Sequence, residues 1–240
     1  MGLLFPRTTF SISYGENVIQ NTQGISMADK KTTDVVEKIL EESKKLNRKF
    51  KQNVDLVINL KNIDLNNPKN RIDQEIILPH GRGNPAKIAL FASGELAVKS
   101  KNLVDLLIKP EDIEDLSKNK KKLKKIADEH DFFIAEAPLM PTIGKTLGTV
   151  LGPRGKMPKP VPPTVDLTNI TKNMRNSVKV RTKGSKTVQT IAGNVDMPKE
   201  QIAENIDAIV KRVESLLERG KMNIGSVYVK TTMGPPGRII

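Results

Sequence analysis

The sequence predicts two kinds of fold in one chain: an α/β domain in the middle and an α+β domain built from both chain ends. Strand and helix patterns alternate between residues 70 and 158, which is typical of a parallel sheet with crossover helices. In the last third, few helices separate the strand patterns, which is typical of α+β. Residues 27–69 offer one helix and one strand, too little for a domain alone. We therefore expect residues 27–69 and 159–240 to form one discontinuous domain, with residues 70–158 inserted.

The first segment contains an extension, a helix and a strand. Residues 1–26 differ in composition from the highly charged segment that follows, and we expect them to be a disordered N-terminal extension. A helical pattern opens near Thr32, with apolar residues at helix-like spacing. Residues 53–60 largely alternate apolar and polar side chains, which predicts a strand. The Asn-Asn-Pro turn at residues 66–68 ends it.

The middle segment predicts the alternating elements. A short apolar run covers residues 74–78. Longer apolar runs predict strands at residues 87–92, 103–108 and 132–137, and the segments between and after them predict helices at residues 94–101, 110–129 and 142–151.

A proline-rich stretch closes the middle segment. Residues 151–163 contain five Pro and two Gly, so we expect no regular element there and interpret the stretch as a linker. An inserted domain requires two chain crossings, and crossings that lie near one another form a hinge. The expected hinge residues are Asn67, Pro68, Pro158, Lys159 and Pro160.

The last third predicts strands around one long helix. Residues 178–182 and 188–195 are interpreted as adjacent strands joined by a Lys-Gly-Ser-Lys turn. Pro198 stands at the first turn of an amphipathic helix that ends at Gly220. A final strand follows at residues 226–232.

The charge of the chain indicates a polyanionic partner. The formal net charge is +13 and the pI is about 9.8, and a chain this basic attracts polyanions in a way that salt weakens. Residues 70–158 hold 15 basic and 12 acidic residues, a net of +3, which leaves +10 to the discontinuous domain. We expect nucleic acid to bind that domain first. The Lys-rich residues 118–125 are a competing patch, with a solvated helix face as the alternative interpretation.

Composition also excludes several kinds of chemistry. The absence of Cys excludes disulfides, thiolate catalysis and Cys-based zinc sites. The only two His, His80 and His130, lie far apart in sequence, so we expect no metal site, no cofactor and no enzymatic activity. No apolar run approaches the roughly 18 residues that cross a bilayer. We expect a cytoplasmic protein without a membrane partner.

Two segments match nucleotide-binding motifs only in part. Residues 81–86 fit a loose G-x-G-x-x-A pattern, but they lead into a predicted strand instead of a helix, and Pro85 intrudes. Residues 144–146, Gly-Lys-Thr, match the end of a phosphate-binding loop, but Leu139 stands where that motif needs Gly. We expect no nucleotide and no small-molecule substrate at either segment.

Three stretches together resemble one family. They are IGKTLGTVLGPRGKMP at residues 143–158, LPHGRG at 78–83 and SVYVKTTMGP at 226–235. They are similar to the ribosomal protein L-one family, in its archaeal form, and the resemblance covers roughly residues 32–240. It implies a discontinuous α+β RNA-binding domain from both chain ends with an inserted Rossmann-like α/β domain on a hinge.

The resemblance also implies where RNA binds. Thr and Ser hydroxyls suit ribose 2′-hydroxyls, Lys suits phosphates, and exposed Phe or Met suits sugar and base faces. The alternative interpretations are structural: Phe50 as a core residue, Met233 and Gly234 as an ordinary turn, and Arg181 as a solvated charge on an edge strand. The candidate RNA-binding residues are Lys49, Phe50, Arg181, Gln189, Ser226, Lys230, Thr231, Thr232, Met233 and Gly234.

The implied function is structural. Members of the family bind a folded element of large-subunit ribosomal RNA at the mobile lateral stalk, beside the tRNA exit site. The inserted domain then assists release of deacylated tRNA, and several members repress translation by binding their own mRNA. We expect a monomer when the chain is free of the ribosome. A chain with 3% aromatic residues suits recognition of RNA shape and backbone better than base stacking.

Two other hypotheses stay open at this point. One alternative is a free RNA-binding regulator that never joins a ribosome, and co-sedimentation with large subunits would distinguish it from a ribosomal protein. The other alternative is a nucleotide-dependent α/β enzyme that uses the inserted domain. Tight binding of ATP or NAD would support the enzyme.

Overall fold

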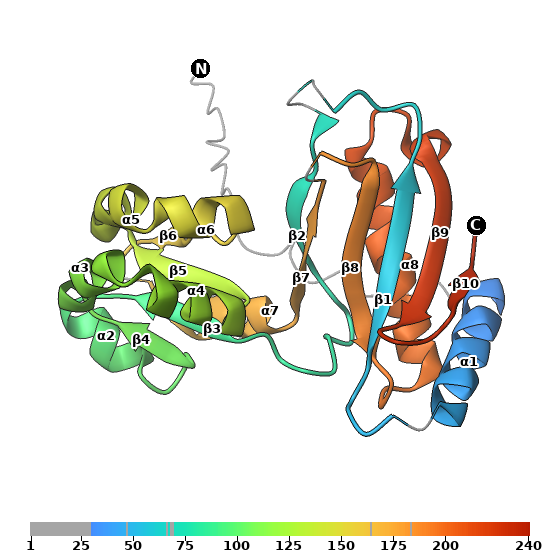
Figure 1. Ribbon diagram of the computed structural model, residues 1–240, viewed down its shortest axis with the longest axis horizontal. Helices are drawn as coiled ribbons and strands as arrows, with labels where there is room; N and C mark the ends of the chain where they lie inside the picture. Colours follow the sequence, from blue (N-terminus) through green and yellow to red (C-terminus); the bar gives the residue numbers. More distant parts are fainter. Residues whose placement is uncertain (1–29, 47, 66, 68–69, 164, 183) are drawn as a thin grey trace, which may run out of the picture.

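The computed structural model describes residues 30–46, 48–65, 67, 70–163, 165–182 and 184–240 (Figure 1). The expected extension at residues 1–26 and the expected hinge residue Pro68 lie outside these residues. The described part holds three sheets: a four-stranded antiparallel sheet, a two-stranded antiparallel ribbon and a four-stranded parallel sheet. In Figure 1 the ribbon lies between the two larger sheets.

The antiparallel sheet is built from both ends of the chain, in the order β10-β9-β1-β8. Buried and partly exposed side chains alternate along its strands, because one face packs on helices α1 and α8. The amphipathic stripes of the two helices, with Val36 and Ile39 of α1 and Ile202, Ile206 and Ile209 of α8, enter that core. The bounds are α1 Lys30–Lys45, β1 Asn53–Leu60, β8 Thr187–Asn194, α8 Lys199–Leu216, β9 Ile224–Thr231 and β10 Pro236–Arg238.

The ribbon pairs β2 (Asp73–Ile77) with β7 (Ser177–Arg181). Ile76 and Val180 lie in the same hydrophobic cluster as the antiparallel sheet. The strand at residues 178–182 is confirmed and contacts the strand at 188–195, as expected of adjacent strands, but the two strands belong to different sheets. The backbone of β7 bonds to β2, and that of β8 bonds to β1.

The parallel sheet has the order β4-β3-β5-β6 and is covered on both faces, which explains the continuous burial of β3 and β5. One hydrophobic cluster includes side chains of α3 to α6, and a second includes those of α2 and α7. The bounds are β3 Ile88–Phe91, α2 Gly94–Ser100, β4 Leu106–Ile108, α3 Pro110–Lys118, α4 Lys120–Glu129, β5 Phe132–Glu136, α5 Met140–Thr146, α6 Gly148–Arg154, β6 Lys159–Val161 and α7 Leu167–Arg175.

The proline-rich stretch is more regular than the sequence indicated. α6 includes Pro153, and β6 includes Pro160 and pairs with β5, so the expectation of no regular element at residues 151–163 is wrong. Pro160 is tolerated because β6 is the edge strand of its sheet, where a missing N–H costs little. The expected helix at 110–129 is two helices, because Asn119 accepts a hydrogen bond from Lys122 N and caps a new start. Helix α7 and strand β10 were not predicted.

The chain passes between the ribbon and the parallel sheet at two adjacent places. Leu78 N donates to Asn176 O (3.0 Å), and Ala86 N donates to Arg175 O (3.1 Å), so residues 78–86 and 175–176 lie side by side. Gly83, at φ +80°, packs so closely that a Cβ would lie 2.7 Å from Asn194 Cβ. The glycine-containing segment 78–83 is therefore a crossing, and not a nucleotide loop.

Candidate nucleic-acid interface

One face of the antiparallel sheet carries α1 and α8, and in the part of the chain that the structure describes no helix covers the other face (Figure 1). We call this second face the open face. The side chains on it are half-buried or exposed, and they are mostly polar. They are Asn53, Asp55, Val57 and Asn59 of β1, Thr187, Gln189 and Ile191 of β8, and Ser226, Tyr228 and Lys230 of β9.

A polar ladder crosses the open face and fixes Ser226. Asn59 Nδ2 donates to Ser226 Oγ (3.0 Å), and Thr187 Oγ1 donates to Asn59 Oδ1 (3.1 Å). Three neighbouring strands are joined in this way, so their hydroxyl groups are held in place at the surface.

A charged pair stands further along the same face. Asp55 lies opposite Lys230 in the register of β1 and β9. Burial raises the pKa of the Asp55 carboxyl group, and the Lys230 ammonium partly offsets that effect. Lys230 is thus a cation on a surface that also holds a poorly solvated carboxylate.

The turn at residues 231–234 closes the end of this sheet and is held by the segment before β1. Thr232 N donates to Asn53 O (3.0 Å), and Asn53 N donates to Thr232 Oγ1 (3.1 Å). Met233 N donates to Gln52 Oε1 (3.1 Å). Gln52 is itself buried and donates to Ser43 Oγ of α1 (3.0 Å). The turn is thus held by Asn53, the first residue of β1, and by Gln52, which is fixed on α1.

Gly234 and Thr231 form the inside of this turn. Gly234 N donates to Thr231 O (3.1 Å), and a Cβ at Gly234 would overlap Thr231 Oγ1. The Thr231 side chain is fully buried, so it supports the turn from beneath and does not reach the surface.

Two large apolar side chains are exposed beside the turn. Phe50 and Met233 are 52% and 56% exposed. The interpretation of Phe50 as a core residue is therefore wrong. Phe50 lines a groove of about 380 Å³ together with Lys44, Arg48 and Lys49. Apolar faces beside several cations can pack on sugars or bases while neutralising phosphates.

The other candidate residues occupy different places. Gln189, Ser226 and Lys230 lie on the open face, whereas Arg181 lies on the ribbon with its Nε 3.4 Å from Asp73 Oδ2. Arg181 and Gln189 line a second cleft, next to the loop after α6. The segment that carries Lys49 and Phe50 is joined to residues 231–234 through Gln52 and Asn53, whereas Arg181 lies on the ribbon.

The expected hinge residues are spread over different elements. Asn67 is exposed, Pro158 is buried, and Lys159 and Pro160 belong to β6. Lys159 Nζ pairs with Glu75 Oε2 of β2 (2.5 Å). The hinge function of these residues stays a prediction.

The sequence did not single out several polar residues of the open face. Asp55, Asn59, Thr187 and Tyr228 share that face with Ser226 and Lys230. The period of two along β1 and β9 was the available signal, because side chains two residues apart point to the same side of a strand.

The parallel sheet has a ligand-binding position by topology, but its chemistry there is unsuited to phosphate. In doubly wound sheets, ligands bind at the carboxyl ends of strands where the order reverses, here β3 and β5. At that point Ser93 N and Oγ both donate to the buried carboxylate of Glu136 (3.0 and 2.6 Å). A carboxylate at this position repels a phosphate. Among the described residues, no group of three acidic or His side chains is placed to hold a metal ion, and no helix is long and apolar enough to cross a membrane.

Comparison with known proteins gives a consistent result. Residues 39–235 match the model of the ribosomal protein L1p/L10e family. The chain is 52% identical to the large ribosomal subunit protein uL1 of Methanocella arvoryzae over 215 residues, 89% of this chain and 100% of the relative. It is 47% identical to the protein of that name from Haloferax volcanii (84% and 94%) and 51% identical to that from Thermoplasma volcanium (78% and 86%).

Proposed function

The chain belongs to the ribosomal protein L1p/L10e family, whose members are structural proteins and not enzymes, and from this premise we propose that it binds large-subunit ribosomal RNA. The contact surface is the open face together with the turn at residues 231–234. Relatives with about half of their residues identical are named as proteins of the large ribosomal subunit, which makes ribosomal RNA the expected partner.

The exposed side chains of Phe50 and Met233, beside a hydrogen-bonded turn, carry this proposal. Single exposed apolar side chains are common on protein surfaces, and what distinguishes Phe50 is its groove with the cations Lys44, Arg48 and Lys49. Met233 stands on the turn that Gln52 and Asn53 hold in place. Because the fold already orders the turn, binding RNA costs little further conformational entropy there.

The chemistry of the surface fits a folded RNA. Hydroxyl groups such as Ser226 Oγ can meet ribose 2′-hydroxyls, which distinguish RNA from DNA. Lys49 and Lys230 can neutralise phosphates, and Gly234 allows the RNA backbone to approach closely. Few aromatic side chains are available for stacking, so recognition depends on shape and on the backbone of the RNA.

We further propose that the parallel sheet and its helices form the mobile unit of a ribosomal stalk beside the tRNA exit site. The two chain crossings support this proposal, because adjacent crossings at residues 78–86 and 176 permit rotation of one unit against the other. On this basis the inserted unit spans about residues 78–176, shifted from the expected 70–158, because β2 packs with the first unit and β6 and α7 with the second. Movement of this unit would assist release of deacylated tRNA.

A second use of the same surface is binding to the protein's own mRNA. An mRNA that presents the shape of the ribosomal site would occupy the open face and the turn, and repress translation. We propose that the chain acts in the cytoplasm and is a monomer when it is not bound to RNA.

Binding to a stalk fragment of large-subunit ribosomal RNA tests the proposal. We expect the wild-type protein to prefer this fragment over an unrelated duplex by roughly a thousandfold. Met233→Ala and Phe50→Ala should each weaken binding about tenfold or more without loss of folding. Met222→Ala is the matched control, because Met222 is 74% exposed and lies outside the open face and the turn. Equal affinity for every RNA, with both variants unchanged, would show that only net charge attracts RNA.

A further inference from the structure

A second cleft lies beside the edge of the open face. It has a volume of about 290 Å³, and its lining comes from β7, β8, the crossing segment, the start of β5 and the loop after α6. Five cations line it, with Asp131 as the one acidic lining residue among those described: Arg82, Arg154, Lys156, Lys179 and Arg181.

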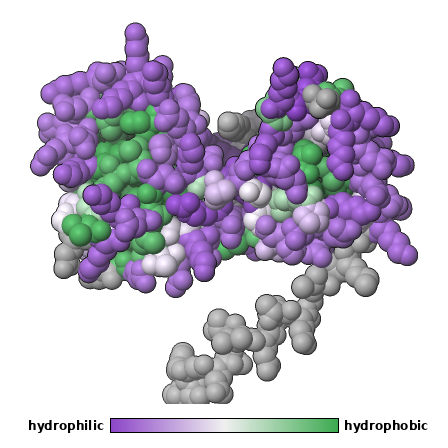
Figure 2. Space-filling view, turned by 90° about the horizontal axis from the view of Figure 1, so that it is seen from below, coloured by the Kyte–Doolittle hydropathy of each residue, from purple (hydrophilic) through white to green (hydrophobic). Residues whose placement is uncertain are grey.

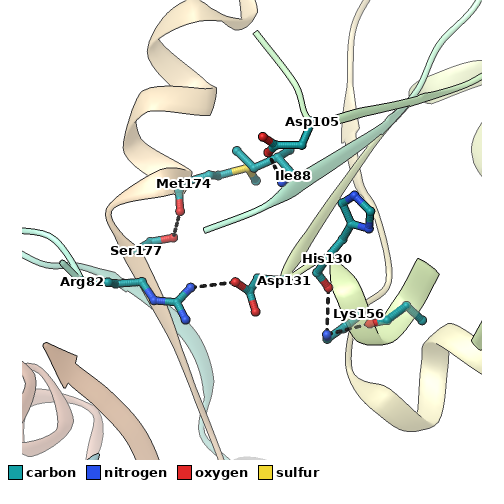
Figure 3. Close-up of polar contacts among 9 residues, drawn as sticks. Arg82, Ile88, Asp105, His130, Asp131, Lys156, Met174 and Ser177 are labelled. Atoms are coloured by element: carbon teal, nitrogen blue, oxygen red, sulfur yellow. Dashed lines mark hydrogen bonds and ion pairs between the residues drawn. The ribbon is translucent and has the colours of Figure 1, made fainter. Parts of the chain in front are cut away.

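The carboxylates near this cleft do not balance its cations. Arg82 Nη1 pairs with Asp131 Oδ2 (3.0 Å), as Figure 3 shows. Asp128 pairs with Arg154 (3.1 Å), and Asp73 is shared between Lys179 and Arg181 (3.3 and 3.4 Å). Three carboxylates thus face five cations, so the cleft attracts an anion.

Two guanidinium nitrogens in the cleft are buried and make no hydrogen bond within the protein: Nε of Arg82 and Nη1 of Arg181. The Arg82 side chain is only 14% exposed. A buried N–H without an acceptor in the protein is unfavourable, and such a group usually hydrogen-bonds to an ordered water or an ion. Lys156 differs, because its Nζ donates to the carbonyls of Ala127 and His130 at the end of α4 (2.7 and 2.8 Å; Figure 3 draws the bond to His130).

The cleft is continuous with the open face. Gln189 and Ile191 belong to the open face and also line the cleft. They lie on β8, the edge strand of the sheet. An RNA that crosses the open face and continues past β8 therefore arrives at Arg82 and Arg181. Seen from below, both halves of the molecule carry many hydrophilic residues, with a broad hydrophobic area on one half (Figure 2).

We propose that this cleft is a second RNA contact, in which Arg82 and Arg181 donate hydrogen bonds to a phosphodiester group of the RNA held on the open face. The proposal rests on the proposed function and deepens it, because it assigns a backbone contact outside the turn. Contacts from Arg82 and Arg181 to a phosphate do not depend on the base sequence of the RNA. They add affinity and fix the position of the RNA relative to the parallel sheet.

The test is the salt dependence of binding to the stalk RNA fragment. Arg82→Gln and Arg181→Gln should each weaken binding about three- to thirtyfold, and each should reduce the slope of log affinity against log salt by about one. Arg212→Gln on the covered side of the sheet is the matched control, and its slope should stay close to that of the wild type. Arg82→Lys retains the charge and should retain the slope.

Asp131→Asn should change the RNA affinity in the opposite direction, and it leaves every Arg in place. Removing this carboxylate frees Arg82 and should raise the affinity and steepen the slope. If the Arg82 and Arg181 variants and Asp131→Asn all bind as the wild type does while Met233→Ala fails, the cleft is not a contact but the proposed function stands. If Met233→Ala and Phe50→Ala bind normally, the proposed function fails instead. If Arg212→Gln loses as much RNA affinity and slope as the Arg82 and Arg181 variants, the cleft only adds to the general attraction of a basic protein for RNA. That result would overturn the proposed contact in the cleft.

Discussion

Replacing Gly83 by Ala should destabilise the protein through two separable effects. Gly83 has φ +80°, and a Cβ there would lie 2.7 Å from Asn194 Cβ and 3.1 Å from Met197 Sδ. The left-handed backbone costs an Ala about 1–2 kcal/mol. Overpacking against two ordered neighbours adds about 1–3 kcal/mol. The free energy of unfolding should therefore fall by roughly 2–5 kcal/mol, which for a chain of this size lowers the Tm by several degrees.

Gly94→Ala separates the two effects. Gly94 also has a positive φ, +50°, but a Cβ there meets nothing within 4 Å. Gly94→Ala should therefore lower the free energy of unfolding only through the unfavourable backbone conformation, by about 1–2 kcal/mol. Urea unfolding followed by circular dichroism measures both variants, with equal m-values as the sign that only the native state changed. Equal losses in the two variants would refute the claim that close packing at the crossing requires glycine.

Three further predictions concern the site and its support. Gly234→Ala should distort the turn by overlap with Thr231 Oγ1 and weaken stalk-RNA binding about tenfold or more, as a filter-binding titration would reveal. Asn205→Leu should lower the free energy of unfolding by about 3 kcal/mol or more, measured in urea, since it removes the Asn205 partner of the buried carbonyls of Gly81 and Ala192 and of the part-buried N–H of His80. Asp55→Asn should stabilise the fold at neutral pH, because burial raises the Asp55 pKa and the ionised carboxylate is unfavourable there. That gain should shrink as the pH falls through the raised pKa, and unfolding midpoints of the two proteins should converge below the ordinary value of 3.8.

Local patterns were sufficient for the elements that bury one clear stripe or run. The strands at residues 53–60, 87–92 and 132–137 are present within one residue of their expected ends, and the helix after Pro198 begins as expected but ends at Leu216, before the expected Gly220. The prediction of no regular element at residues 151–163 failed, because it rested on the proline content of that stretch alone. An edge position decides whether a missing N–H matters, and only the sheet order supplies that position.

The candidate site shows the same division. The resemblance identified Phe50, Met233 and Gly234, and the structure brings their segments together although they lie far apart in the chain. Whether Phe50 was core or surface depended on what packs around it, and the structure exposes it. Thr231 was expected at the RNA surface, but its place on β9 turns its side chain into the core.

The sequence by itself determined the net positive charge, the absence of cysteine chemistry, the order of most helices and strands, and the family. These properties depend on composition and on short-range periodicity, which the chain carries before it folds. Only the tertiary structure decided which strands pair, which face of the sheet stays open, and that Arg82 and Arg181 line one cleft. Pairing and burial depend on contacts between residues distant in sequence, and no local pattern specifies those contacts.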